Sequence, residues 1–149
     1  KLRHLCIRSP MIKGDGLKHL RLLGDLEYLE VGSSVYLLGE LGGFDDSTIY
    51  CALDGLKHVC GLRDLKVLNL AGSPISDEGL LHVTCVDGLE RLNLNWTAVT
   101  DRGISRLRSM RNLGALRLRG TSVTVKGMEQ VRQALPRAWI GDLAPLEGD

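Results

Sequence analysis

The stretch LNLNWTAVTDRGISRL, residues 92–107, occurs three times along the chain with small changes. The chain reads LNLAGSPISDEGLLHV at 68–83 and LRLRGTSVTVKGMEQV at 116–131, so the copies follow one another at steps of 24 residues. A fixed period of this length predicts stacked supersecondary units that share one continuous core. This repeat therefore decides the fold.

Each unit contains two blocks, L-x-x-L-x-[LIV] and then a block close to G-[LIM]-x-x-[LV]. The end of the first block alternates as a short strand with one buried face does. The second block has the apolar spacing of a helix. Successive strands then run parallel through crossover helices, which favours a right-handed coil. We predict an α/β right-handed solenoid with parallel strands on its concave face and helices on its convex face.

The units start near residues 2, 26, 65, 89 and 113, which predicts about five repeats in a single domain spanning 1–149. We expect Leu2 to be the first core residue. Because the chain begins with a repeat and not with Met, we also expect a fragment or processed form of a longer protein.

The step from the second unit to the third is 39 residues, which places an insertion near 37–51. In repeat proteins an insertion maps to a loop on one face, so it is either a partner-contacting loop or a tolerated surface excursion. At the other end, residues 136–149 do not begin another unit. Pro136 ends the preceding helix, and Trp139 and Ile140 are expected to form a last strand that caps the core. The alternative for Trp139 is a binding residue.

The turn before each helix has a chemistry of its own. Ser76 and Thr100 precede an aspartate, where a hydroxyl can cap a helix by accepting a backbone N–H and the carboxylate suits the positive helix N-terminus. In the last unit Val125 replaces the aspartate after Thr124, so we expect that helix start to be less well stabilised.

These motifs resemble a leucine-rich repeat protein over residues 2 to 136. The form L-x-x-L-x-L-x-x-T-x-[VI]-[TS]-D-x-G-[LI] is similar to the subclass with T-x-V-T-D-x-G-L turns found in F-box-associated repeats, bacterial effectors and protist repeat proteins. The resemblance implies a scaffold that binds another protein, such as the recognition module of a ubiquitin-ligase adaptor or a subunit of a large assembly.

Composition restricts the function. Hydrophobic residues make up 44% of the chain and the net charge is +1, which favours a folded domain and argues against a protein devoted to nucleic acid. No apolar run approaches the roughly 18 residues of a membrane span. The four cysteines form no C-x-x-C pair, so we expect reduced thiols in an intracellular protein of the cytoplasm or nucleus. Disulfides are the alternative.

The sequence offers no catalytic, cofactor or metal motif, and we predict a non-catalytic protein without cofactors. His19, His58 and His82 occupy the same helical position in three units. A preference of that repeat position explains them better than catalysis or metal binding.

The outward strand positions are the expected binding surface. Arg91, Asn93, Asn95, Arg117 and Arg119 form a polar and basic corner, and Trp96 stands where neighbouring units have glycine. Trp and Arg dominate interface hot spots, although local packing or a solvated face would also account for them. The candidate partner-binding residues are Tyr28, Glu30, Asn69, Arg91, Asn93, Asn95, Trp96, Arg117 and Arg119. We predict a protein partner, acidic in character. The alternative is an RNA- or phosphate-binding platform that uses the basic C-terminal repeats, although nucleic acid has little aromatic surface to stack on.

Overall fold

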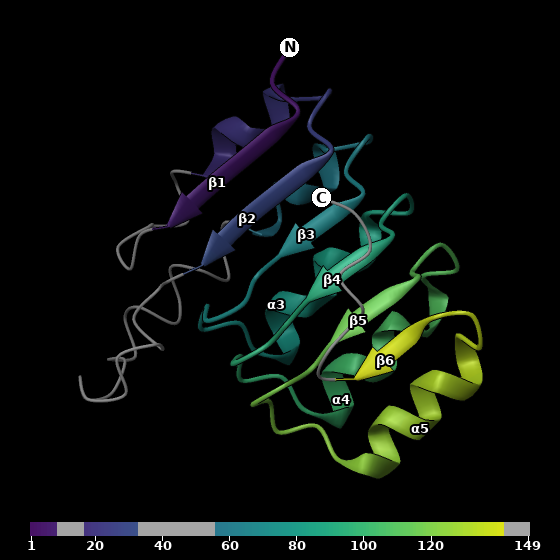
Figure 1. Ribbon diagram of the computed structural model, residues 1–149. Coiled ribbons are helices and arrows are strands. Elements are labelled where there is room, and N and C mark those ends of the chain that lie inside the picture. The colour runs from purple at the N-terminus through teal and green to yellow at the C-terminus, as the bar shows by residue number, and fades with distance from the viewer. Residues whose placement is uncertain (9–16, 33–55, 142–149) are drawn as a thin grey trace, which may run out of the picture.

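The computed structural model describes residues 1–8, 17–32 and 56–141. Within these residues the strands form one parallel sheet, in which β1 to β6 follow one another in chain order. Figure 1 shows the strands side by side in one layer, with the helices in a second layer behind them. The strands are β1 His4–Arg8, β2 Tyr28–Gly32, β3 Val67–Asn69, β4 Arg91–Asn93, β5 Ala115–Arg117 and β6 Trp139–Gly141.

The helical layer is made of shorter pieces than the sequence pattern suggests. Two short α-helices continue directly or after one residue as 3-10 helices, and only α5, with ten residues, is longer than two turns in the described part of the chain. A unit of 24 residues leaves few residues for the return path, and a 3-10 helix covers about 2 Å per residue against about 1.5 Å in an α-helix. The elements are η1 Lys18–Leu22, η3 Val59–Gly61, α3 Asp77–Leu81, η4 Val83–Cys85, α4 Asp101–Ile104, η5 Ser105–Ser109 and α5 Val125–Ala134.

The register places each strand residue beside its equivalent one repeat further on. One column is His4, Tyr28, Val67, Arg91 and Ala115, and the next is Cys6, Glu30, Asn69, Asn93 and Arg117. Backbone hydrogen bonds continue the pairing beyond the strands, because Trp96 N donates to the Arg119 carbonyl at 2.7 Å. The register confirms the columns that the repeat spacing predicts.

Leucines fill the space between the two layers. Leu26, Leu65, Leu89 and Leu113 open their units and are at most 2% exposed. The prediction that Leu2 is the first core residue is wrong, because Leu2 is 48% exposed. It lies just before β1, which pairs only with β2 among the described strands, so one side of the first rung stays open.

The turns are tied from one repeat to the next by aspartate and threonine. Thr100 donates its backbone N–H and its hydroxyl to Asp77 at 2.8 and 2.6 Å, and Thr124 donates the same pair to Asp101 at 2.7 and 2.6 Å. Each threonine hydroxyl also caps its own helix by accepting a backbone N–H. The cap predicted at Ser76 makes no side-chain hydrogen bond.

This ladder adds a second role for the aspartates. Asp101 accepts from Thr124 of the next repeat, so the start of α5 is also held by the preceding turn. Val125 is 79% exposed and leaves the first turn of α5 without the negative charge that α3 and α4 have there. The weaker start of α5 stays a prediction.

A disulfide joins Cys60 of η3 to Cys85 of η4, with the two Cα atoms 5.3 Å apart. The expectation of reduced thiols is wrong for this pair. Cys60 and Cys85 come together because consecutive units stack their helical segments, and their Cα separation lies in the range that a disulfide spans. Cys6 is free and exposed.

Two predicted segments lie mostly outside the described residues: the insertion near 37–51 and the final part of the cap at 136–149. Within the described part of the cap, Trp139 and Ile140 lie in β6, beside Ala115 and Leu116 of β5. Ile140 is buried and Trp139 is half-buried.

Candidate interaction surface

The nine candidate residues fall into two groups on the strand layer. Tyr28, Glu30 and Asn69 lie on β2 and β3. The other six lie on β4, on β5 and in the turns that follow them, and we call them the β4–β5 corner. The corner is Arg91, Asn93, Asn95, Trp96, Arg117 and Arg119. All nine side chains are exposed or half-buried, so each is within reach of a partner.

The first group is organised around the Glu30 carboxylate. Its Oε2 accepts hydrogen bonds from Tyr28 Oη at 2.8 Å and Asn69 Nδ2 at 3.3 Å, with Cys6 Sγ at 4.0 Å. The ring of His4 meets that of Tyr28 edge to face, with centroids 5.8 Å apart. Burial and the neighbouring carboxylate raise the pKa of Tyr28, because both disfavour a phenolate. The polar groups of this half thus bond to one another. Sequence reasoning did not include His4 and Cys6 in the site, although both stand in its columns.

The asparagines of the corner are held in fixed orientations by the backbone. Asn93 Oδ1 accepts the N–H of Asn95 at 3.0 Å, and Asn95 Oδ1 accepts the N–H of Arg119 at 2.8 Å. Because the acceptor atom of each amide is engaged, its Nδ2 group is left as a donor. These hydrogen bonds hold the turns after β4 and β5 in a fixed conformation.

Trp96 has an unusual backbone conformation. Its φ angle is +57°, and Gly72 and Gly120 occupy the equivalent positions of the adjacent repeats with φ of +69° and +67°. The left-handed region suits glycine and costs other residues about 1–2 kcal/mol. The repeat therefore demands this conformation, and a tryptophan adopts it here.

The Trp96 side chain lies over the next repeat. Its ring occupies the space where a Cβ at Gly120 would stand, and the guanidinium of Arg119 lies 5.6 Å from the ring centroid, within cation–π range. The side chain is nevertheless 45% exposed.

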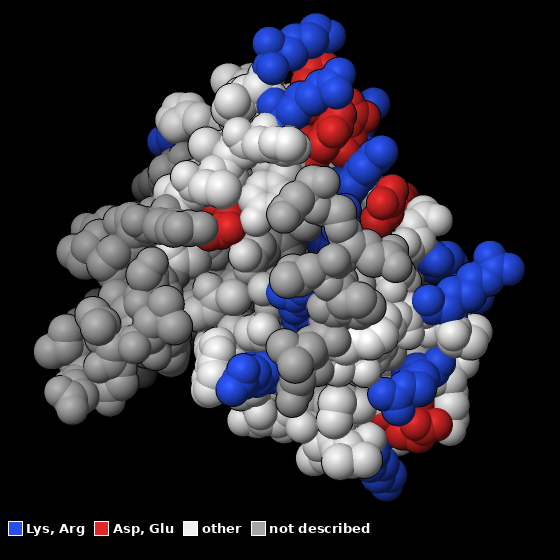
Figure 2. All heavy atoms as spheres, viewed as in Figure 1, with Lys and Arg blue, Asp and Glu red and all other residues white. Residues whose placement is uncertain are grey.

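Positive charge in the corner has no compensating partner among the described residues. The guanidinium groups of Arg91 and Arg117 make no hydrogen bond or ion pair there. At the starts of the first strands, by contrast, two pairs of opposite charges meet, Lys1–Asp25 and Arg3–Glu27. Figure 2 shows this contrast, since blue and red alternate along one edge while blue lies among white atoms near the ends of β4 and β5.

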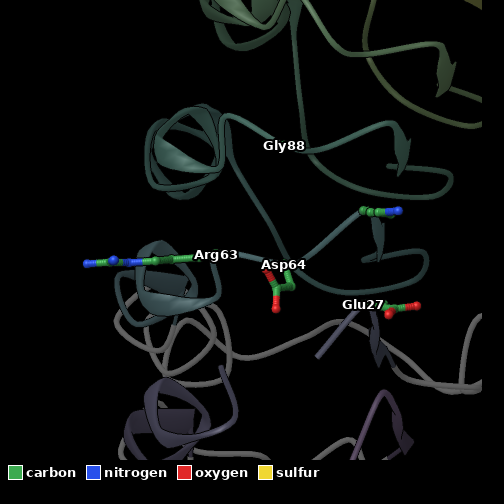
Figure 3. Close-up of a pocket in the computed structure, with 5 residues that line it drawn as sticks. Glu27, Arg63, Asp64 and Gly88 are labelled. Atoms are coloured by element: carbon green, nitrogen blue, oxygen red, sulfur yellow. The ribbon is translucent and has the colours of Figure 1, made fainter. Parts of the chain in front are cut away.

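A shallow hollow of about 310 Å³ lies on the edge where the strands begin, lined by Glu27, Arg63, Asp64, Lys66 and Gly88. In Figure 3 the side chains of Arg63 and Glu27 point away from each other and Asp64 points in a third direction. Because these charged groups do not converge, the hollow offers no defined ligand site.

Neither a metal site nor a membrane-spanning helix is found in the described part of the chain. No cluster of three or more His, Cys, Asp or Glu there has metal-binding geometry. No helix within 1–8, 17–32 and 56–141 is long and apolar enough to cross a bilayer.

The comparisons with known proteins agree with this architecture. A leucine-rich repeat family profile matches residues 61–81 and 89–107, while no curated protein matches the sequence significantly. The parallel sheet, the helical layer and this match define the fold as an α/β leucine-rich repeat solenoid.

Solved structures share the fold at low sequence identity. An internalin (inlF) from Listeria monocytogenes is 20% identical, with a TM-score of 0.61, and the match covers 96% of this chain and 35% of the internalin chain. A chain of the Chaetomium Mex67:Mtr2 subunits is 21% identical with a TM-score of 0.52, over 71% of this chain and 78% of its own. A leucine-rich repeat protein from Leptospira interrogans is 18% identical with a TM-score of 0.50, over 93% and 36%. This chain spans about a third of the length of the two bacterial proteins.

Proposed function

We propose that this protein is a non-catalytic interaction module that binds an acidic protein partner through its concave strand surface, centred on the β4–β5 corner. Leucine-rich repeat solenoids present extended concave surfaces for binding. The observation that carries the proposal is Trp96, an exposed tryptophan in a backbone conformation that the adjacent repeats give to glycine.

The backbone conformation of Trp96 has a cost in free energy. Strain of about 1–2 kcal/mol is retained in proteins chiefly where it has a role. Glycine at this position would remove the strain, as Gly72 and Gly120 do in the adjacent repeats. Tryptophan instead gives the surface a large, rigid aromatic group, which is the residue type most enriched at interface hot spots.

The charge of the corner supports an acidic partner. Arg91, Arg117 and Arg119 lie on β4, on β5 and in the turn after β5, with no carboxylate bonded to them among the described residues. Like charges gathered without counter-charges repel one another, and a complementary negative surface relieves that repulsion and speeds encounter. The Glu30 group, whose members bond to one another, extends the same surface toward β1.

The test is affinity capture from a native extract with four forms of the chain, followed by mass spectrometry. These are the wild type, Trp96→Gly, the double variant Arg117→Glu/Arg119→Glu, and Arg102→Glu as a control on the helical layer. We expect a protein retained by the wild type and the control to be lost with the other two. Equal capture by all four folded forms would exclude the corner as the binding site.

A second candidate function is the RNA- or phosphate-binding platform. It is favoured by Arg102, Arg106, Arg108 and Arg111, which crowd α4, η5 and the segment after them. Binding of this kind weakens steeply with salt, in proportion to the number of phosphates contacted. Retained nucleic acid in the capture experiment, lost on Arg102→Glu, would favour this function over the first.

We further propose that the module serves as an adaptor or subunit within a larger complex, a ubiquitin ligase being one version. The support is the resemblance of its T-x-V-T-D-x-G-L turns to F-box-associated repeats. Co-purification with ligase subunits tests it.

An intracellular location stays a prediction, and the Cys60–Cys85 disulfide weakens it, because the expectation rested on reduced thiols. Alkylation of free thiols in intact cells, followed by mass spectrometry, measures the state of that pair.

A further inference from the structure

Four side chains of the β4–β5 corner offer hydrogen-bond donors to a ligand. The amide oxygens of Asn93 and Asn95 each accept a backbone N–H group, which leaves their Nδ2 groups as donors. The guanidinium groups of Arg117 and Arg119 have donors and no acceptor. A surface so rich in donors is matched to a group that only accepts, and its positive charge favours an anion.

The geometry concentrates these donors on a small area. Asn93 lies directly beside Arg117 in the register of β4 and β5, at the spacing of about 4.8 Å that separates neighbouring strands. Asn95 and Arg119 are in contact two residues further along, at 2.8 Å between Oδ1 and the backbone nitrogen. Two residues along a strand span about 6.6 Å. One anionic group above the centre of this patch is therefore within side-chain reach of all four residues.

We propose that this patch binds a phosphorylated serine or threonine side chain of the partner protein. The inference rests on the proposed function and names the chemistry of its ligand. A carboxylate has two acceptor oxygens and a single negative charge, whereas a phosphate monoester has three acceptor oxygens and a charge near −2. The two positive charges and the two amide donors of the patch match the charge and the number of oxygens of the phosphate better. Trp96, at the margin of the patch, is placed to pack against the peptide chain on either side.

The variants that test this proposal follow from the fixed asparagines. In Asn93→Asp and Asn95→Asp the side chain keeps the shape and the oxygen that accepts the backbone N–H, while the outward donor becomes a carboxylate oxygen. The fold is thus preserved as the ligand-facing group is reversed. Arg117→Gln removes one guanidinium, and Arg21→Gln removes one charge from η1 in the helical layer as its matched control. Thermal melts of each variant confirm that it is folded.

The probes are three degenerate peptide libraries with a fixed central phosphoserine, glutamate or serine, applied to the full chain at pH 5 and pH 7. We expect the phosphoserine library alone to be retained, more strongly at pH 7, because the second phosphate ionisation lies near pH 6. Glutamate is ionised at both values. We expect Asn93→Asp, Asn95→Asp and Arg117→Gln each to weaken retention about tenfold or more, as for lost charge-assisted hydrogen bonds, and Arg21→Gln to leave it unchanged.

Two results would overturn the proposal. One is equal retention of the glutamate and phosphoserine libraries, which leaves the acidic-partner function standing. The other is that the wild type and Asn93→Asp retain each library equally. The capture experiment with Trp96→Gly judges the proposed function separately, since it does not depend on phosphate.

Discussion

Position 96 should reverse the usual order of alanine and glycine in stability. Replacing Trp96 by either residue removes the same ring, which is somewhat more than half buried and touches Gly120 and Arg119. Only glycine also removes the left-handed strain, worth about 1–2 kcal/mol. Glycine also lowers the stability by about 0.5–1 kcal/mol, because it loses more conformational entropy on folding than alanine does. We therefore expect Trp96→Gly to be more stable than Trp96→Ala by roughly 1 kcal/mol.

The comparison with the wild type adds the lost contacts. Burying about half of a large apolar side chain contributes about 1–1.5 kcal/mol, and an exposed cation–π contact about 0.5 kcal/mol. Release of strain offsets most of this loss. Trp96→Gly should then lie within roughly 1 kcal/mol of the wild type, while its binding of the partner is lost.

Urea unfolding of the three proteins measures the stability differences, and the capture assay or a binding titration measures function. If the alanine variant is as stable as the glycine variant, the backbone at Trp96 carries no strain and the energetic argument fails. If the glycine variant binds the partner as the wild type does, Trp96 is a packing residue. The two readouts thus judge the strain and the function independently.

Three further predictions concern the framework. Gly103→Ala places a Cβ against the Asp77 carboxylate and should cost about 1–3 kcal/mol in urea unfolding, whereas the same change at an uncrowded glycine should not. The two threonine hydrogen bonds lower the pKa of Asp101, so its contribution to stability is present above about pH 3.9, its ordinary value, and is lost as pH falls below it; in thermal melts at pH 7, 4 and 3, Asp101→Asn should remove part of this acid sensitivity. Reduction of the Cys60–Cys85 disulfide, which closes a loop of 25 residues, should lower the free energy of unfolding by about 3 kcal/mol, and the Cys60→Ser/Cys85→Ser variant should match the reduced wild type without responding to reductant.

The strand surface could be predicted because two periods in the sequence determine it. Alternation along a strand selects the outward residues, and the step of 24 residues sets which of them share a column. Asn93 and Arg117 are 24 residues apart and share a column, and they are partners in the register of β4 and β5. The glycines aligned with Trp96 also marked its position. Its φ angle follows from them once the repeats are known to share one backbone path.

The contacts between repeats were not predictable from local rules. Thr100 reads as a helix cap from its neighbours alone, and it is one. Its second role, as donor to Asp77, requires knowing that residues 23 apart meet. The pairing of Cys60 with Cys85 was not predicted, for a related reason. Cys60 and Cys85 are separated by 25 residues and not by the repeat step, so they do not fall in one column of the alignment.

The same repeat that builds the framework also aims the proposed binding groups. Asn95 joins its turn to the next repeat through the Arg119 backbone, and that bond fixes where the exposed Trp96 and Arg119 side chains begin. The outward amide and guanidinium groups contribute nothing comparable to the core, which consists of leucines behind the sheet. Changes at the outward atoms should therefore alter binding and leave folding intact, whereas changes at the ladder atoms should alter both. Under the proposed function, this separation lets one framework recognise a partner through a few residues of two adjacent repeats.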